Sequence, residues 1–165
     1  MFLVRQYSIL FISLYSFKYI VGKSLDKENT DAKKLAILNA QLCGDKLAED
    51  VIIIDLSEIK TAPSDYFVVA TTTSSSQMDA IADSILRTSK DYKLISPRIE
   101  GREALEWVLI DYFDIVVHVM TLEVRTRFKI EKLWGDGKFY TVNQEAEMNE
   151  ISYDDVLEFY RATLD

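Results

Sequence analysis

The hydroxyl-rich segment at residues 71–77, TTTSSSQ, holds the side chains with the greatest capacity for chemistry. Hydroxyls placed before a helix can bind phosphate, and in enzymes that transfer nucleotidyl groups a glycine-serine turn precedes two aspartates that hold a catalytic metal. Here that glycine is absent, and Asp79 and Asp83 stand four positions apart instead of forming a neighbouring pair. We interpret the serines as helix caps and the two aspartates as first-turn and exposed helix positions. For the function of the chain, an enzyme acting on a nucleotide with a divalent metal is therefore kept only as the alternative to a non-catalytic role.

Histidine and cysteine, the other common residues of catalytic and metal sites, occur once each, at His118 and Cys43. His118 lies in IVVHVM, where strand alternation places it on the same face as Val116 and Met120, so we expect a hydrogen-bonded histidine in or beside the core. A lone cysteine excludes an intramolecular disulfide and a cysteine-rich zinc site, and fits a small core or surface thiol. The sequence also lacks the motifs HxxxH, HExxH, CxxC, GxSxG and the P-loop. We therefore predict no catalytic residue, no metal site and no cofactor.

Composition limits the chain to one ordinary domain and disfavours nucleic acid as a direct partner. The 165 residues are 48% hydrophobic and 28% charged, with a formal net charge of -8. Such a length supports a single core with appendages. Because nucleic-acid binders concentrate basic residues on one surface, the acidic balance predicts no sequence-specific nucleic-acid contact and favours a basic protein partner.

Charge is distributed unevenly and divides the chain into three zones. Residues 1–25 form an apolar leader with three basic residues and no acid, residues 26–140 form the expected domain, and residues 141–165 form a tail with seven acids against one arginine. The leader's uncharged run at 6–17 is too short for a membrane span of about twenty residues, and no small-residue cleavage site follows it. We interpret the leader as a mis-extended start or an organellar transit peptide, and we expect no membrane partner. The composition of the tail predicts a mobile extension, and the alternative is that Val156, Leu157, Phe159 and Tyr160 form one weak helical turn or more.

Hydrophobic periodicity predicts an α/β fold in which a mixed five-stranded sheet is flanked by helices. Two continuous β-branched runs, VIIIDL at 51–56 and YFVVAT at 66–71, are typical of strands buried on both faces. The other strands are predicted at 94–100, 107–110 and 115–120, the last two joined by a tight hairpin. The helices are predicted over 31–47, 78–86 and from 121 to a stop near Trp134-Gly135, where glycine adopts a left-handed conformation.

Three blocks in this order and spacing resemble the RsfS ribosomal silencing factors, also called the Iojap-like family. The blocks are DYFVVATTTSSSQMDAIAD, RIEGREALEWVLIDYFDIVVHVM and EVRTRFKIEKLWGD, and the resemblance covers roughly residues 31–136. It implies a nucleotidyltransferase-like fold without catalytic residues. It further implies binding to the large ribosomal subunit through its fourteenth protein, on the face where the subunits join, so that the small subunit is blocked and translation is repressed. The implied location is the cytoplasm, with a mitochondrion or plastid as the alternative, and a homodimer is left open.

The resemblance also implies a partner-binding site on one strand. Trp107 matches the tryptophan of the family's second block, and Glu100, Leu109 and Asp111 match neighbouring positions. Alternation places Trp107, Leu109 and Asp111 on one face of their strand, and an aspartate at the end of that face favours exposure. An exposed tryptophan beside acids suits a basic protein surface, because aromatic anchors supply contact area and charges supply register. The alternative is that Trp107, like Trp134, is structural.

Two further residues, Asp65 and Tyr66, match the family at the entry of the second predicted strand and complete the predicted partner-binding set. A turn acid next to a strand aromatic is equally explained by a local role. The chain departs from the family at three turns, where Thr72 replaces a frequent glycine, Phe113-Asp114 replaces a glycine-aspartate hairpin and Leu122 replaces a helix-opening proline. These changes alter turn geometry rather than the proposed contacts.

Overall fold

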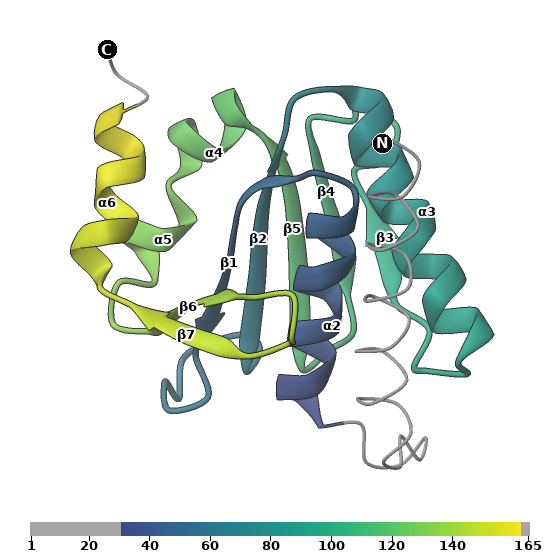
Figure 1. Ribbon diagram of the computed structural model, residues 1–165, viewed down its shortest axis with the longest axis horizontal. Helices are drawn as coiled ribbons and strands as arrows, with labels where there is room; N and C mark the ends of the chain where they lie inside the picture. Colours follow the sequence, from purple (N-terminus) through teal and green to yellow (C-terminus); the bar gives the residue numbers. More distant parts are fainter. Residues whose placement is uncertain (1–30, 163–165) are drawn as a thin grey trace, which may run out of the picture.

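The computed structural model describes residues 31–162, which build a seven-stranded sheet in the order β3-β4-β5-β2-β1-β6-β7 (Figure 1). Its central strand β2 (Tyr66–Thr72) is buried at every position, because its β-branched and aromatic side chains are covered on both faces. The strand β5 (Ile115–Thr121) runs parallel to β2, and every other pair of neighbouring strands is antiparallel. The sheet is therefore mixed, as predicted. The predicted leader, residues 1–25, lies outside the described residues.

The other strands extend the sheet in both directions from this parallel pair. On the β2 side lie β1 (Glu49–Asp55), β6 (Lys138–Val142) and β7 (Met148–Ile151). On the β5 side lie β4 (Trp107–Asp111) and the short edge strand β3 (Arg98–Glu100). The predicted tight hairpin between β4 and β5 is confirmed by their antiparallel register, in which Leu109 faces His118.

Two helices cover one face of the sheet: α2 (Ala32–Asp45) and α3 (Ser75–Asp91). The serine of the hydroxyl-rich segment that caps α3 is Ser74, whose side chain accepts from the Gln77 backbone N–H at 3.2 Å. Between these helices and the sheet, fully buried residues such as Val68, Ile81 and Ile110 form the larger core cluster. None of the helices within residues 31–162 is long and apolar enough to cross a bilayer.

The opposite face is covered by three shorter helices, α4 (Leu122–Phe128), α5 (Ile130–Leu133) and α6 (Tyr153–Ala162). Figure 1 shows these helices gathered beside β1 and β6, away from β3. Val124, Ile130 and Val156, one from each helix, are buried in a second core cluster with residues of β1, β2 and β6. The helices thus cover mainly the β1 side of this face, and α4 reaches β5 and packs its Phe128 against Trp107 of β4.

The sheet has seven strands rather than the predicted five, because two strands come from residues assigned to the domain boundary and the tail. The β6–β7 hairpin pairs with β1 through contacts such as Ile54 with Phe139. In α6, Val156 and Tyr160 lie four positions apart on one helical face, and both are buried. The prediction that residues 141–165 form a mobile extension therefore disagrees with the structure of residues 141–162, because this segment contributes side chains to the core. Short polar edge strands such as MNEI give almost no periodic signal.

The last predicted helix is divided into α4 and α5 at Lys129. This residue adopts a left-handed conformation, with φ 48° and ψ 54°, and its N–H closes α4 by donating to the Arg125 carbonyl at 2.9 Å. The prediction that Gly135 adopts the left-handed conformation is wrong, because Gly101 is the glycine with positive φ among the described residues.

Candidate partner-binding site

The strand β4 has one buried face and one partly open face. Val108 and Ile110 are fully buried on the α3 side, whereas Trp107 and Leu109 are half-buried and Asp111 is exposed on the other side. This alternation agrees with the predicted common face of Trp107, Leu109 and Asp111. Leu109 and Asp111 are available for contact because α5 and α6 lie over the other half of the sheet (Figure 1), whereas Trp107 packs against Phe128 of α4 and stays partly exposed.

A row of aromatic rings crosses this open face. The ring of His118 lies 4.6 Å from that of Phe67 and 5.9 Å from that of Trp107, measured between centroids. The row continues from Trp107 to Phe128 at 5.0 Å, and from Phe67 to Trp134 at 5.9 Å. Phe128, at the end of α4, is 53% exposed, so the row ends in an accessible aromatic side chain. Trp134 contributes to this packing, in agreement with its predicted structural role.

Charged side chains border the open face on the β3 side. Arg98 and Glu100 form an ion pair at 3.0 Å and flank Leu109 and Asp111 through the register of β3 and β4. The Asp111 carboxylate accepts from the Phe113 backbone N–H at 2.7 Å, which fixes the hairpin tip. With two acids against one arginine, this border favours a basic partner.

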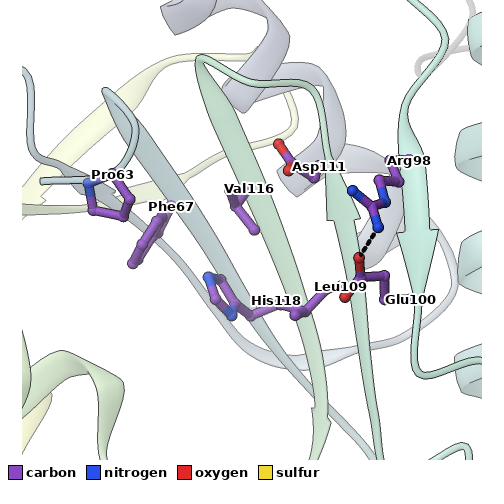
Figure 2. A pocket seen from close by; sticks show the side chains of 8 residues that line it. All are labelled: Pro63, Phe67, Arg98, Glu100, Leu109, Asp111, Val116 and His118. Atoms are coloured by element: carbon purple, nitrogen blue, oxygen red, sulfur yellow. Dashed lines mark ion pairs between the residues drawn. The ribbon is translucent and has the colours of Figure 1, made fainter.

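Between the aromatic row and this charged border lies a cavity of about 240 Å³. Figure 2 shows that its wall combines apolar side chains with one imidazole and the border charges. The lining residues are Pro63, Phe67, Arg98, Glu100, Leu109, Asp111, Val116 and His118. Three of the predicted partner-binding residues, Glu100, Leu109 and Asp111, therefore meet around one cavity, and Trp107 lies beside it.

The predicted residues Asp65 and Tyr66 do not join this group. Tyr66 packs into the core under α2 and α3, on the opposite face from Phe67, and burial followed by the charge of Asp55 raises its pKa to about 12. Asp65 is exposed at the entry of β2, where its N–H donates to the Asp114 carbonyl at 2.9 Å. These contacts support a local role for both residues.

His118 lies on the predicted face, with Val116 and Met120, but its predicted hydrogen bonds are absent. The side chain is 6% exposed, and within residues 31–162 neither imidazole nitrogen has a hydrogen-bond partner. Burial lowers its pKa to about 3, so the imidazole is neutral at physiological pH. Strand alternation correctly predicted the face of His118, but its position at the cavity could not be predicted, because the register that sets it opposite Leu109 is a tertiary feature.

The turn before β4 is held in place by its glycine and its arginine. Gly101 has φ +80°, and a Cβ there would collide with the Trp107 carbonyl oxygen. Arg102 forms ion pairs with Asp79, at 2.7 Å, and with Asp83. The two candidate aspartates thus bind an arginine on the surface of α3 and fix the loop that leads into Trp107. Asp79 lies in the second turn of α3 and not in the first turn as predicted.

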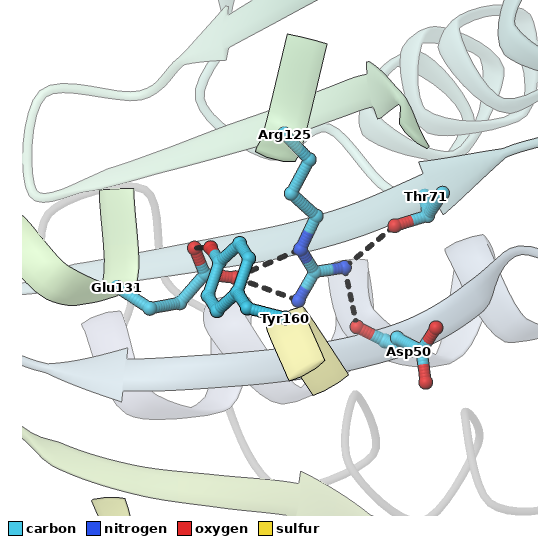
Figure 3. Close-up of polar contacts among 5 residues, drawn as sticks. All are labelled: Asp50, Thr71, Arg125, Glu131 and Tyr160. Carbon is cyan, nitrogen blue, oxygen red and sulfur yellow. Dashed lines mark hydrogen bonds and ion pairs between the residues drawn. The ribbon is translucent and has the colours of Figure 1, made fainter. Parts of the chain in front are cut away.

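A buried polar network anchors α4, α5 and α6 to the sheet (Figure 3). Arg125 is 2% exposed and Glu131 0%, and the guanidinium Nε and Nη2 donate to Glu131 Oε1 at 2.8 and 2.7 Å. Nη1 donates to Thr71 Oγ1 at 2.7 Å and to the Asp50 carbonyl at 2.8 Å. The Tyr160 hydroxyl donates to the other oxygen of Glu131, and burial followed by that carboxylate raises the pKa of Tyr160. The hydroxyl of Thr71 therefore accepts a hydrogen bond within this network. Across residues 31–162, no cluster of three or more His, Cys, Asp or Glu side chains is arranged to hold a metal ion.

The fold and the site define a small α/β protein with a partly open sheet face that carries aromatic and acidic side chains, an arrangement suited to binding another protein. Residues 29–159 match the family described as ribosomal silencing factor during starvation, RsfS, and the chain belongs to this family. It is 36% identical to the RsfS of Bacillus subtilis over 105 residues, which are 64% of this chain and 88% of that protein. It is 38% identical to the RsfS of Chromobacterium violaceum over 111 residues, which are 67% of this chain and 88% of that protein.

Other similarities extend to an animal protein and to solved structures. A mouse protein named mitochondrial assembly of ribosomal large subunit protein 1 is 31% identical over 90 residues, which cover 53% of this chain and 39% of the mouse protein. A crystal structure of a Chromobacterium violaceum protein superposes with a TM-score of 0.60 at 34% identity, over 64% of this chain and 88% of that one. A Bacillus halodurans structure gives a TM-score of 0.53 at 34% identity, over 64% of this chain and 95% of that one.

Proposed function

We propose that the protein binds the large ribosomal subunit at its subunit-joining face, through the fourteenth large-subunit protein, and so blocks association with the small subunit and represses translation. The observation that carries this proposal is the open face of β4, where Trp107, Leu109 and Asp111 lie side by side in a member of a ribosomal silencing family. The names of its relatives, ribosomal silencing factor in Bacillus subtilis and mitochondrial assembly of ribosomal large subunit protein 1 in mouse, support a ribosomal partner. The protein then acts in the compartment that holds its ribosome, the cytoplasm or an organelle.

The chemistry of the open face supports a protein partner with a basic surface. Trp107 provides a half-buried aromatic anchor beside the exposed ring of Phe128, and Glu100 and Asp111 supply negative charge at the border. Interfaces gain most of their affinity from such central aromatic anchors, whereas charges at the rim mainly set orientation and association rate. The net charge of -8 disfavours direct attraction to ribosomal RNA, so a basic ribosomal protein is the more favourable target.

Co-sedimentation with separated ribosomal subunits tests the proposal. The protein is expected to pellet with the large subunit and to reduce the joined-ribosome peak when small subunits are added. Trp107→Ala is expected to weaken large-subunit binding by about 2 kcal/mol or more, roughly thirtyfold. Pelleting with the small subunit alone would refute the proposal. The thermal midpoint of Trp107→Ala is measured alongside, because loss of binding through unfolding would remove Trp107 from the interface.

A matched pair of charge reversals tests the acidic border. Asp111→Lys is expected to weaken binding, with an effect that shrinks as salt rises, because rim charges are screened over about 8–10 Å at moderate ionic strength. Asp91→Lys reverses an exposed charge at the end of α3, on the other side of the sheet, and serves as the control. Equal losses from both variants would indicate a general charge effect and not a site at β4.

We further infer that the fold acts as a nucleotidyltransferase-like scaffold for binding and not for catalysis. The hydroxyl-rich segment supports this inference, because Ser74 caps α3, Thr71 accepts from Arg125, and the nearby Asp79 pairs with Arg102. A thermal-shift assay with nucleotides and magnesium is expected to show no change in the melting temperature. A ligand at about a hundred times its dissociation constant would add about 2.7 kcal/mol, and a stabilisation that disappears with chelator would favour the enzymatic alternative.

A further inference from the structure

The cavity beside Trp107 contains a polar group that the fold itself leaves unsatisfied. The His118 imidazole forms part of the cavity wall, is 6% exposed, and makes no hydrogen bond to any residue within 31–162 (Figure 2). The indole Nε1 of Trp107, whose ring centroid lies 5.9 Å from that of His118, is also buried and without a partner within those residues. Two unsatisfied groups therefore adjoin each other at the open face of the sheet.

An unpaired buried imidazole destabilises the folded chain, because its hydrogen bonds to water are lost and no protein bonds replace them. The neighbouring rings of Phe67 and Trp107 would pack as well against a phenylalanine at this position. Local features that oppose stability are concentrated at functional positions in natural proteins. The position of His118 at a cavity on the proposed interface indicates that the hydrogen-bonding capacity is used when a partner docks.

The cavity wall defines the chemistry of the group that fits. Phe67, Leu109 and Val116 are apolar, so they favour an apolar body and disfavour a buried charge. A neutral imidazole offers one donor and one acceptor and so pairs with an uncharged hydroxyl or amide. Because both ring nitrogens are buried, docking would require a rotation about the broad χ2 torsion of the histidine that turns a ring nitrogen toward the cavity.

We propose that the cavity receives one side chain of the ribosomal protein partner, with an apolar body and an uncharged hydroxyl or amide end, and that His118 forms a hydrogen bond with this end on docking. The inference rests on the proposed function and specifies the chemistry of its partner. Glu100 and Asp111 at the mouth then bind a basic residue that neighbours the inserted one.

The substitution His118→Phe tests this assignment because stability and binding are expected to change in opposite directions. The variant removes the unpaired polar group and keeps a ring, so its melting temperature is expected to rise by a few degrees. Its affinity for purified large ribosomal subunits of the same source is expected to fall about tenfold, the equivalent of one lost hydrogen bond. His118→Gln, which restores a donor and an acceptor, is expected to recover part of the affinity.

Two further variants separate the role of His118 from general packing. Tyr112→Phe removes a buried hydroxyl that bonds to Ser89 at 2.7 Å under α3, and is expected to lower stability without weakening binding. Leu109→Trp fills the cavity from a half-buried position without altering the histidine, and is expected to weaken binding.

Normal binding by His118→Phe or by Leu109→Trp would overturn the inference and leave the proposed function standing. Failure of the unaltered protein to pellet with large subunits would overturn the proposed function and this inference with it.

Discussion

The buried imidazole of His118 predicts a specific dependence of stability on pH. Because burial lowers its pKa from 6.5 to about 3, the unfolded chain binds a proton at pH 5 and the folded chain does not. Protons therefore favour unfolding, and stability falls as the pH drops from about 6.5 toward 3. At pH 5 the unfolded-state pKa is 1.5 units above the solution pH, and at 1.36 kcal/mol per unit the loss is about 2 kcal/mol relative to pH 7.5. This is a substantial share of a total stability of about 5–15 kcal/mol.

Urea unfolding at pH 7.5, 6.5, 5.5 and 5.0, compared between the unaltered protein and His118→Phe, measures this effect. His118 is the single histidine of the chain, so carboxylates and other groups contribute equally to both proteins and the difference isolates the imidazole. The variant is expected to lack the loss of about 2 kcal/mol. An NMR titration of the histidine in the folded protein is expected to show no midpoint above pH 5. Parallel loss of stability in both proteins, or a midpoint near 6.5, would refute the burial argument.

Three further perturbations test the structure around the site. Arg125→Met leaves one charge of a buried pair unpaired and is expected to lower the free energy of unfolding in urea by about 3–5 kcal/mol, whereas the double variant with Glu131→Leu costs less than the sum of the two single changes. Deleting residues 153–165 removes α6 from the core, so circular dichroism is expected to show a lower melting temperature, and an unchanged midpoint would mean that α6 does not stabilise the domain. Gly101→Ala forces a Cβ against the backbone at positive φ and is expected to lower the free energy of unfolding in urea by about 1–3 kcal/mol. The control Gly44→Ala, with open space around it, is expected to be neutral or stabilising, and equal effects of the two variants would contradict the crowding at Gly101.

Hydrophobic periodicity was sufficient to predict the central strands of the sheet. The runs at 51–56 and 66–71 became β1 and β2, because continuous β-branched segments are stable only where both faces are covered. The hairpin of β4 and β5 followed from two alternating runs around a short turn. The β6–β7 hairpin and α6 were not predicted as parts of the core, since β7 and α6 are largely polar and their positions depend on pairing with β1 and packing on the sheet.

The sequence by itself determined the family resemblance, the mixed α/β class, and the common face of Trp107, Leu109 and Asp111, because these depend on local alternation and on order along the chain. Only the tertiary structure showed that Tyr66 lies on the opposite face of the sheet, and that the rings of Phe128 and His118 lie against Trp107. The reason is that strand register and helix placement join residues distant in sequence, and each depends on which surfaces the whole chain buries. The unpaired state of His118 is likewise a property of its assembled surroundings, because a hydrogen-bond partner is defined only once every neighbouring element is in place.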